Sequence, residues 1–345
     1  MARCSSRSAS FIYDSFSRGG GQVPRHTFRG RRRSLADLPE LNPAVKYIAT
    51  YWDASLHDPE RLAFDLVRDG LAAGGDRARA ANYVGAVGTQ AGKVVLRDME
   101  TGEEVDFAAS VIVNASGPWT DLTNMALGNH TQHMGGTKGS HIVIDNARLL
   151  AATGGRELFF EHKDGRIVLI YPLKGRVLVG TTDLEHDMAD PIVCTDAEVD
   201  YFLGLIAHVL PNVSVDRTDI VYRFAGVRPL PGHGDMSPGF VSRDYRVEAA
   251  SLSDASGPKV LSLVGGKWTT FRASAEHLTD RVLTLLQQSR RKSTRSLAIG
   301  GGKCYPVTAS SRRDWVTAHS SALGVERASA LLNRYGTVAS EVIAA

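Results

Sequence analysis

The stretch Val264-Gly265-Gly266-Lys267-Trp268-Thr269-Thr270-Phe271-Arg272 joins a short apolar segment to an amphipathic one. The apolar segment, Val260 to Leu263, has the length and content of a buried strand. In residues 273–287, which follow, apolar side chains recur at helical spacing. Two glycines, a lysine and two threonines therefore lie where a strand turns into a helix.

Two interpretations of this corner remain open. Glycines let the backbone approach a ligand closely, and the free N–H groups at a helix start favour an anion or an electron-rich ring edge. The alternative is a tight turn in which Thr269 serves as the N-cap of the helix. Local physics alone favours the turn, so the decision depends on the rest of the chain.

The composition is that of a globular protein with a sizeable core. The chain has 345 residues, 43% of them hydrophobic, and a net charge of +3, so we expect two domains and no nucleic-acid partner. Residues 1–33 hold eight arginines against the single acid Asp14, and residues 18–33 look turn-like. An organellar presequence and a surface-binding arm are alternatives to a disordered terminus. We favour disorder because no apolar core of a signal peptide follows.

Other broad classes find little support in the sequence. Cys4, Cys194 and Cys304 are far apart, which argues for a reducing compartment and against a zinc site. No apolar run is long enough to span a bilayer. The sequence also lacks a nucleophile elbow, a P-loop, a zinc-protease motif and a dinucleotide-binding glycine fingerprint.

Turn and periodicity signals predict a helix and then strands in the first part of the chain. Asp58 is placed to cap a helix that Gly74-Gly75 ends. A hairpin is expected across residues 94–107, and a strand at Val111 to Val113. That strand enters a second glycine-bearing corner, Asn114 to Asp121, which opens a helix.

Similar signals continue through the rest of the chain. A glycine-rich corner, Gly135 to His141, precedes a strand at Ile142 to Ile144. Thr195 is expected to cap a helix that stops at Pro211. The further predicted elements are antiparallel strands at 158–160, 167–171 and 177–179, strands at 220–224 and 240–241 joined by residues 225–230, and helices near 310–318 and 323–335.

Three polar residues stand out as candidates for chemistry. His141 starts a predicted strand directly after a glycine-rich corner, although a lone histidine is more often surface or satisfied core. Arg228 and Arg243 each lie at a strand edge beside a turn. Two guanidinium groups converging on one pocket would bind a phosphate bidentately, which lysine does less well. The alternative is that both are ordinary surface arginines.

Six short motifs occur in one order along the chain. They are Asn114-Ala-Ser-Gly-Pro-Trp119, Lys138-Gly-Ser-His141, Val179-Gly-Thr-Thr-Asp183, Ala225-Gly-Val-Arg-Pro-Leu230, Ser242-Arg-Asp244 and Gly265-Gly-Lys-Trp-Thr-Thr-Phe-Arg272. Each motif is weak alone, but the ordered set closely resembles the FAD-dependent, quinone-linked glycerol-3-phosphate dehydrogenases of the glycine-oxidase-like flavoprotein superfamily. The resemblance runs from about residue 40 to about residue 302.

The resemblance implies an α/β (α+β) fold with three parts. These are an incomplete FAD-binding Rossmann-like domain, an antiparallel-sheet substrate cap domain and the start of a helical C-terminal domain. The expected boundaries are 1–40 for a divergent basic N-terminal segment, 41–135 and 255–300 for the FAD-binding domain, 136–254 for the cap and 301–345 for the helical domain.

By the same resemblance, FAD is the cofactor and sn-glycerol 3-phosphate the substrate, oxidised to dihydroxyacetone phosphate. His141 and Lys267 would be catalytic, and which of them is the base stays open. Substrate would be bound by His141, Arg228, Arg243 and Lys267. The expected cofactor contacts are Ala115, Ser116, Gly117, Trp119, Thr181, Gly266, Lys267, Trp268 and Thr269.

The resemblance also implies a quinone acceptor, a homodimer, and peripheral attachment to the cytoplasmic face of the inner membrane, or a mitochondrial surface in a eukaryote. The family begins with a βαβ unit whose glycine fingerprint holds the FAD pyrophosphate, and this sequence starts after it. We therefore expect a fragment, truncated at the N-terminus and in its C-terminal domain, that binds FAD poorly. An amine or 2-hydroxyacid oxidase of the same superfamily and a non-catalytic remnant are the alternatives.

Overall fold

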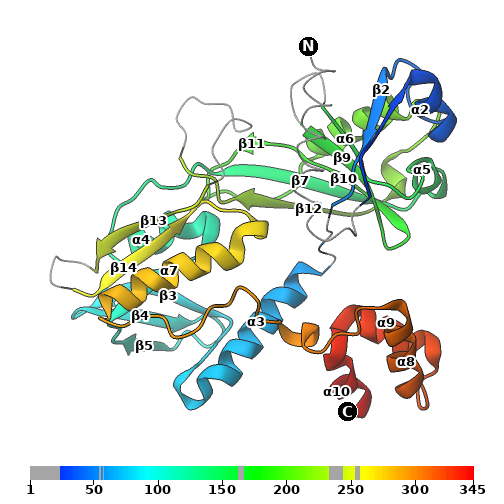
Figure 1. The fold of residues 1–345 in the computed structure, drawn as a ribbon. Coiled ribbons are helices and arrows are strands. Elements are labelled where there is room, and N and C mark those ends of the chain that lie inside the picture. Colours follow the sequence, from blue (N-terminus) through cyan, green and yellow to red (C-terminus); the bar gives the residue numbers. More distant parts are fainter. Residues whose placement is uncertain (1–23, 54–55, 57, 162–166, 233–243, 253–256) are drawn as a thin grey trace. The chain divides into compact units, whose positions relative to one another are not determined.

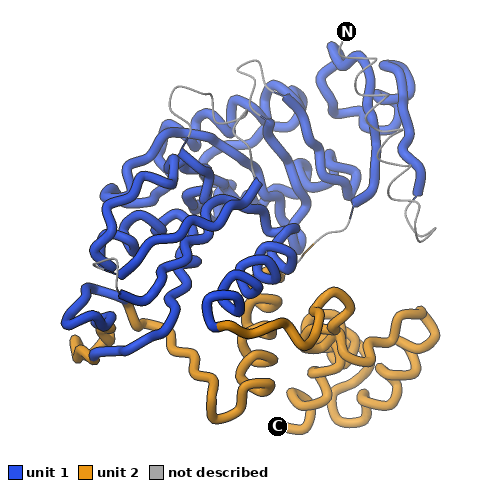
Figure 2. The backbone as a smooth tube through the Cα atoms, turned by 60° about the vertical axis from the view of Figure 1, so that its left-hand side comes forward, with its two compact units in different colours: residues 1–53, 86–95, 106–286 blue, residues 54–85, 96–105, 287–345 orange. Residues whose placement is uncertain are grey.

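The computed structural model describes residues 24–53, 56, 58–161, 167–232, 244–252 and 257–345 (Figure 1). The chain divides into two compact units (Figure 2). The first unit comprises residues 1–53, 86–95 and 106–286, and the second comprises residues 54–85, 96–105 and 287–345. Helices and antiparallel sheets together confirm the predicted fold class.

The largest sheet belongs to the first unit and has six strands in the order β11-β7-β10-β9-β8, with β12 paired to β7. All of these strands pair antiparallel. The strands are β7 (Thr137–Ile144), β8 (Leu158–Glu161), β9 (Ile167–Leu173), β10 (Arg176–Gly180), β11 (Leu184–Glu185) and β12 (Ile220–Arg228). In this register His141 of β7 lies opposite Gly180 of β10 and Phe224 of β12.

One face of this sheet carries the main hydrophobic core. Alternate β7 residues such as Ile142 and Ile144 pack with residues of α6 (Asp196–Val209), among them Phe202, and all three are fully buried. Each such side chain contributes roughly 1.5–3 kcal/mol through burial. Thr195 caps α6 with a complete capping box, as predicted. Because strand side chains alternate, His141 lies on the opposite face from Ile142.

A second sheet of this unit has the order β13-β14-β6. Its strands are β6 (Val111–Asn114), β13 (Arg246–Ser251) and β14 (Lys259–Val264). β14 runs parallel to β6, with Ser262 opposite Asn114, and antiparallel to β13. The two parallel strands therefore end at the same edge, and each continues into a helix, which confirms both predicted strand-to-helix corners.

The two helices after these strands begin in the same way. A short 3₁₀ turn precedes each of them, and both helices pack against β14. The elements are η3 (Gly117–Trp119) and α4 (Thr120–Ala126) after β6, and η6 (Trp268–Thr270) and α7 (Phe271–Leu285) after β14.

The described residues 24–53 belong to the first unit and form strands and a helix, contrary to the predictions of a disordered terminus over residues 1–33 and of turns over residues 18–33. They form β1 (Thr27–Gly30), α2 (Arg31–Asp37) and β2 (Tyr47–Thr50), and β1 pairs antiparallel with β2. Asp37 accepts hydrogen bonds from Arg156, 119 residues away, at 2.7 Å, and from Arg29 at 3.1 Å. These partners are invisible to local sequence patterns, which explains the error. Residues 1–23, with Cys4 and three of the eight early arginines, lie outside the described residues.

The second unit is mainly helical and contains the helices predicted after Asp58 and near 310–318 and 323–335. Its elements are α3 (Pro59–Gly74), η2 (Gly75–Arg77), η7 (Gly300–Gly302), α8 (Ala309–Ala318), α9 (Val325–Tyr335), η8 (Gly336–Val338) and α10 (Ala339–Ala344). Asp69 of α3 accepts hydrogen bonds from Gly300 N and Lys303 Nζ at 2.9 and 2.8 Å, so α3 and η7 are held together. A separate three-stranded sheet, whose residues are divided between the two units, consists of β3 (Val84–Gln90), β4 (Lys93–Asp98) and β5 (Glu104–Phe107).

Three predicted boundaries were wrong, and the sequence analysis did not predict β1, β2, β3, β11, β13 or α5 (Ala147–Ala152). The strand predicted at 240–241 lies outside the described residues. β7 begins at Thr137 and β12 continues to Arg228, so two segments predicted as corners are strands. Pairing of β7 on both edges holds Gly139 extended, which overrides the weak strand preference of glycine. Thr269 is not the cap: Thr270 Oγ accepts from Lys267 N at 3.2 Å, and α7 starts at Phe271.

No helix in the part of the chain that the structure describes combines the length and the apolar character that crossing a membrane would require.

Candidate functional site

His141 lies on the face of the six-stranded sheet that is opposite the core. Its ring stacks on Phe224 with a centroid separation of 5.0 Å and an interplanar angle of 10°. Gly180 gives it room, since a Cβ there would lie 2.2 Å from the imidazole. The ring atom Nδ1 is buried and has no hydrogen-bond partner. A buried polar atom without a partner costs free energy, so this nitrogen is suited to meet a ligand group.

Arg228 ends β12 on the same side of the sheet. Its guanidinium donates to Asp183 Oδ1 at 2.9 Å, to Thr181 Oγ1 at 2.9 Å and to the Thr182 carbonyl at 3.2 Å. A Cβ added at Gly139 would lie 2.4 Å from this guanidinium, so the arginine crosses β7 where the strand has no side chain. Asp183 and Thr181 thus orient a partly buried cation beside the histidine.

The environment keeps His141 neutral. Burial, together with the positive charge of Arg228, lowers the pKa of His141 from 6.5 to about 4. Burial disfavours the imidazolium because it removes water, and a nearby cation repels it. The ring is therefore an unprotonated acceptor throughout the neutral range.

The two glycine corners lie side by side at the carboxyl edge of β6 and β14. At the first, Gly117 has a positive φ of 63°, and at the second Gly265 and Gly266 have φ of 78° and 103°. Trp119 and Trp268 beside them are 48% and 44% exposed. Ligands of α/β proteins bind at the carboxyl ends of parallel strands, where helix starts offer N–H groups. Both corners fit a flat, anionic cofactor such as a dinucleotide.

A buried polar network fixes the first corner. Asn114 Nδ2 donates to the Thr120 carbonyl at 2.9 Å and to Asn124 Oδ1 at 2.8 Å, and Ser262 Oγ donates to the same Asn124 oxygen at 2.9 Å. Ser116 Oγ donates to Asn114 Oδ1 at 2.7 Å. The corner is therefore tied to α4 and to the neighbouring strand β14, which holds both corners in one register.

The structure brings some predicted site residues together and leaves others apart. His141, Arg228 and Thr181 form one group, although Thr181 was predicted as a cofactor contact. Ala115, Ser116, Gly117 and Trp119 lie at the first corner, and Gly266, Lys267, Trp268 and Thr269 at the second. Lys267 is exposed. Its backbone N–H donates to the Thr270 hydroxyl, and its carbonyl accepts from that hydroxyl. Arg243 lies outside the described residues.

β12 connects the histidine group to both corners. It contacts η3 of the first corner. Just beyond β12, Pro231 lies against the second corner, where a Cβ on Gly265 would be 3.2 Å from the proline ring. Arg228, at the end of β12, therefore lies close in sequence to Pro231, which approaches the second corner.

Two residues with a role in this site escaped the sequence analysis. Asp183, which pairs with Arg228, stood inside a quoted motif but was assigned no function. Glu198 lies on α6, 30 residues before Arg228, and the sequence analysis did not single it out. The signal that could have pointed to Asp183 was its place in the run Thr181-Thr182-Asp183, directly after a predicted strand.

The parallel pair with its glycine corners, beside an antiparallel sheet with buried polar groups on one face, defines a mixed α/β protein of the class that binds cofactors at strand ends. Residues 14–281 match the family described as FAD dependent oxidoreductase, and the chain belongs to this family.

Individual relatives with curated names include dehydrogenases. The chain is 29% identical over 315 residues to the glycerol-3-phosphate dehydrogenase of Synechocystis sp., covering 86% of this chain and 55% of that protein. It is 31% identical over 229 residues to the D-erythritol 1-phosphate dehydrogenase of Brucella abortus, covering 64% and 44%. The chain thus spans about half the length of the curated relatives that it matches.

A solved structure shows the same fold. The glycerol-3-phosphate dehydrogenase from Bacillus halodurans complexed with FAD matches with a TM-score of 0.72 at 24% identity, covering 92% of this chain and 62% of that one. The resemblance of the sequence to this flavoprotein superfamily is therefore confirmed at the level of family and fold.

Proposed function

We propose that this chain carries the substrate side of an FAD-dependent dehydrogenase that oxidises sn-glycerol 3-phosphate to dihydroxyacetone phosphate. The observation that carries the proposal is the neutral His141 beside the oriented guanidinium of Arg228 on the face of the sheet opposite the core. A polyol phosphate needs a cation for its phosphate and an acceptor for its hydroxyl proton. The relatives named for polyol phosphates support this substrate class.

The chemistry assigns one task to each residue. Oxidation of a secondary alcohol removes the hydroxyl proton while hydride leaves the carbon, and bound FAD supplies the hydride acceptor. His141 accepts the proton at Nδ1, which is unpartnered and unprotonated at neutral pH. Arg228 donates N–H groups to the phosphate and thereby orients the alcohol toward His141. Product release then requires His141 to return its proton to solvent.

The two corners are the proposed flavin contacts. Ala115, Ser116, Gly117 and Trp119 on one side, and Gly266, Lys267, Trp268 and Thr269 on the other, would hold the cofactor by backbone N–H groups and ring surfaces. Lys267 would stabilise negative charge that develops during the reaction. Thr181 would lie at the boundary between substrate and cofactor, which its hydrogen bond with Arg228 supports.

Several further assignments belong to the proposal for the whole protein. Arg243 would supply the second phosphate contact, and electrons would pass to a quinone at a membrane surface, with the protein as a homodimer on the cytoplasmic side. The domain boundaries expected from the sequence, 1–40, 41–135 with 255–300, 136–254 and 301–345, belong to the same proposal.

Anaerobic mixing tests the function. The chain is saturated with FAD, and glycerol 3-phosphate is expected to abolish the visible absorbance of the bound flavin, whereas glycerol leaves it unchanged. D-Erythritol 1-phosphate tests how far the polyol chain can extend. Bleaching by an amine or a 2-hydroxy acid, with none by glycerol 3-phosphate, would replace this proposal by the oxidase alternative.

A further inference from the structure

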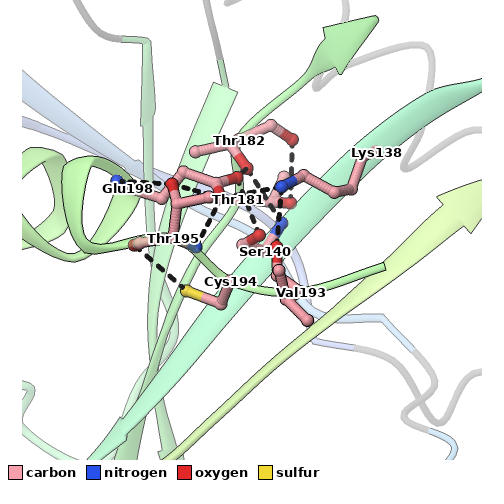
Figure 3. Close-up of polar contacts among 8 residues, drawn as sticks. All are labelled: Lys138, Ser140, Thr181, Thr182, Val193, Cys194, Thr195 and Glu198. Atoms are coloured by element: carbon pink, nitrogen blue, oxygen red, sulfur yellow. Dashed lines mark hydrogen bonds and ion pairs between the residues drawn. The ribbon is translucent and has the colours of Figure 1, made fainter. Parts of the chain in front are cut away.

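A buried carboxylate lies directly behind the site, on the core side of β7. Glu198, in the first turn of α6, is only 4% exposed. Its Oε1 accepts hydrogen bonds from Ser140 Oγ and Thr182 Oγ1, both at 2.7 Å, and its Oε2 accepts from the N–H and hydroxyl of Thr195 at 2.9 Å. Figure 3 shows these contacts converging on one side chain.

Lys138 completes the set and balances the charge. This lysine is 6% exposed, and its Nζ lies 2.9 Å from Glu198 Oε2 and 2.7 Å from the Val193 carbonyl. Burial by itself would raise the pKa of Glu198, but hydrogen bonds from Thr195, Thr182, Ser140 and Lys138 outweigh it and lower that pKa to about 2. Glu198 is therefore ionised and fully hydrogen-bonded, which favours a single geometry.

Two short paths lead from this carboxylate to the site. Thr182 Oγ1 donates to Glu198 and accepts from the Ser140 N–H at 2.9 Å, which fixes the segment after β10 against β7. The carbonyl of the same Thr182 accepts from Arg228 at 3.2 Å. The other path passes through Ser140, the residue next to His141 in β7.

We propose that Glu198 is a positioning residue that, through Thr182 and Ser140, fixes the backbone on which Arg228 and His141 are held in their mutual geometry. As a statement about substrate binding, this rests on the proposed function. The competing role is purely structural. Glu198 would then only attach the N-terminus of α6 to the sheet, through its bonds with Thr195 and Lys138.

Two threonines offer a matched pair of variants that separates these roles. Thr182→Val and Thr195→Val each remove one hydroxyl bonded to Glu198 and keep the side-chain shape. Thr182 connects the carboxylate to the Arg228 segment, whereas Thr195 belongs to the helix cap. Both variants are expected to lower the unfolding midpoint, because each loses a buried hydrogen bond.

Binding of glycerol 3-phosphate to the full chain, measured by calorimetry, is the first readout. Thr182→Val is expected to raise the dissociation constant about tenfold, as for loss of one well-placed hydrogen bond, and Thr195→Val to change it less than about twofold. Thr182→Ser, which keeps the hydroxyl, should restore affinity. Equal effects of the two valine variants would leave Glu198 with only its structural role.

The second readout needs no ligand, so it separates this inference from the proposed function. The His141 ring is titrated by NMR in the unliganded chain, with its resonance assigned by its loss in His141→Gln. Thr182→Val should move the His141 pKa upward, because the segment that carries the Arg228 acceptors is no longer fixed to β7 and Arg228 shifts away from the ring, and Thr195→Val should not. An unmoved His141 titration in Thr182→Val overturns the inference, whereas absent glycerol 3-phosphate binding in the unaltered chain overturns only the proposed function.

Discussion

The face that holds His141 depends on two residues that have no side chain. Gly139 leaves the space through which the Arg228 guanidinium crosses β7, and Gly180 leaves the space that the imidazole fills. A side chain at either position would meet the functional group at 2.4 or 2.2 Å. At the scale of residues, the site therefore depends on the two glycines that leave space as much as on the charged side chain that occupies it.

His141→Gln in the FAD-loaded chain should lower kcat/KM by a hundredfold or more, on the order expected for loss of a general base. An ordinary histidine would give a pH limb around 6.5, but the lowered pKa places the limb in the unaltered chain near 4. The pH–rate profile checks both statements, with His208→Gln on the exposed surface as control. A limb that persists in His141→Gln and disappears in Lys267→Met would make the lysine the base.

Arg228→Lys should lower kcat/KM for glycerol 3-phosphate by about ten- to a hundredfold, since one ammonium cannot replace a guanidinium that also bonds Asp183 and Thr181. Steady-state kinetics give the value. Arg223→Lys is the matched control, because Arg223 lies on the same strand but pairs with Asp196 at an exposed position. Equal and small effects in the two variants would return Arg228 to the class of surface arginines.

At the scale of elements, β7 is held from both sides and from behind. β12 and β10 pair with its edges, and the Lys138–Glu198 pair joins it to α6. The glycine-containing first half of the strand, which alone would favour a turn, is extended because these neighbours fix it. The same strand therefore presents Lys138 to the core and His141 to the site.

Lys138→Met should reduce the free energy of unfolding by about 3–5 kcal/mol, because it leaves the buried charge of Glu198 without its cation. Urea denaturation measures the change. Arg176→Met breaks the exposed pair with Asp145 and should cost no more than about 1 kcal/mol. If the two substitutions cost the same, the Lys138–Glu198 pair does not hold the element in place.

At the scale of the whole molecule, the buried groups of the site link stability to pH. His141 in the folded chain has a pKa of about 4, below its value of 6.5 when unfolded. The unfolded chain therefore binds more protons between these values, and stability falls as the pH is lowered through this window. Glu198, with a folded pKa of about 2, adds a further loss between about pH 4.5 and 2.

Thermal unfolding between pH 7 and 4 tests this linkage. The unaltered chain should lose up to roughly 3 kcal/mol over this range from His141 alone, as integration of the pKa difference requires. His141→Gln should show a correspondingly flatter dependence of the midpoint on pH. Parallel curves for the two proteins would mean that the folded chain does not hold His141 neutral.

The sequence by itself determined the strand-to-helix corners, the Thr195 cap and most helices, because caps, glycines and apolar periodicity act over a few residues. It also determined the family, through the order of its motifs. Only the tertiary structure decided that Arg228 pairs with Asp183, 45 residues away, and that Glu198 lies behind His141. Strand pairing and burial depend on neighbours distant in the chain, and so do the pKa of His141 and the extended form of β7 around Gly139.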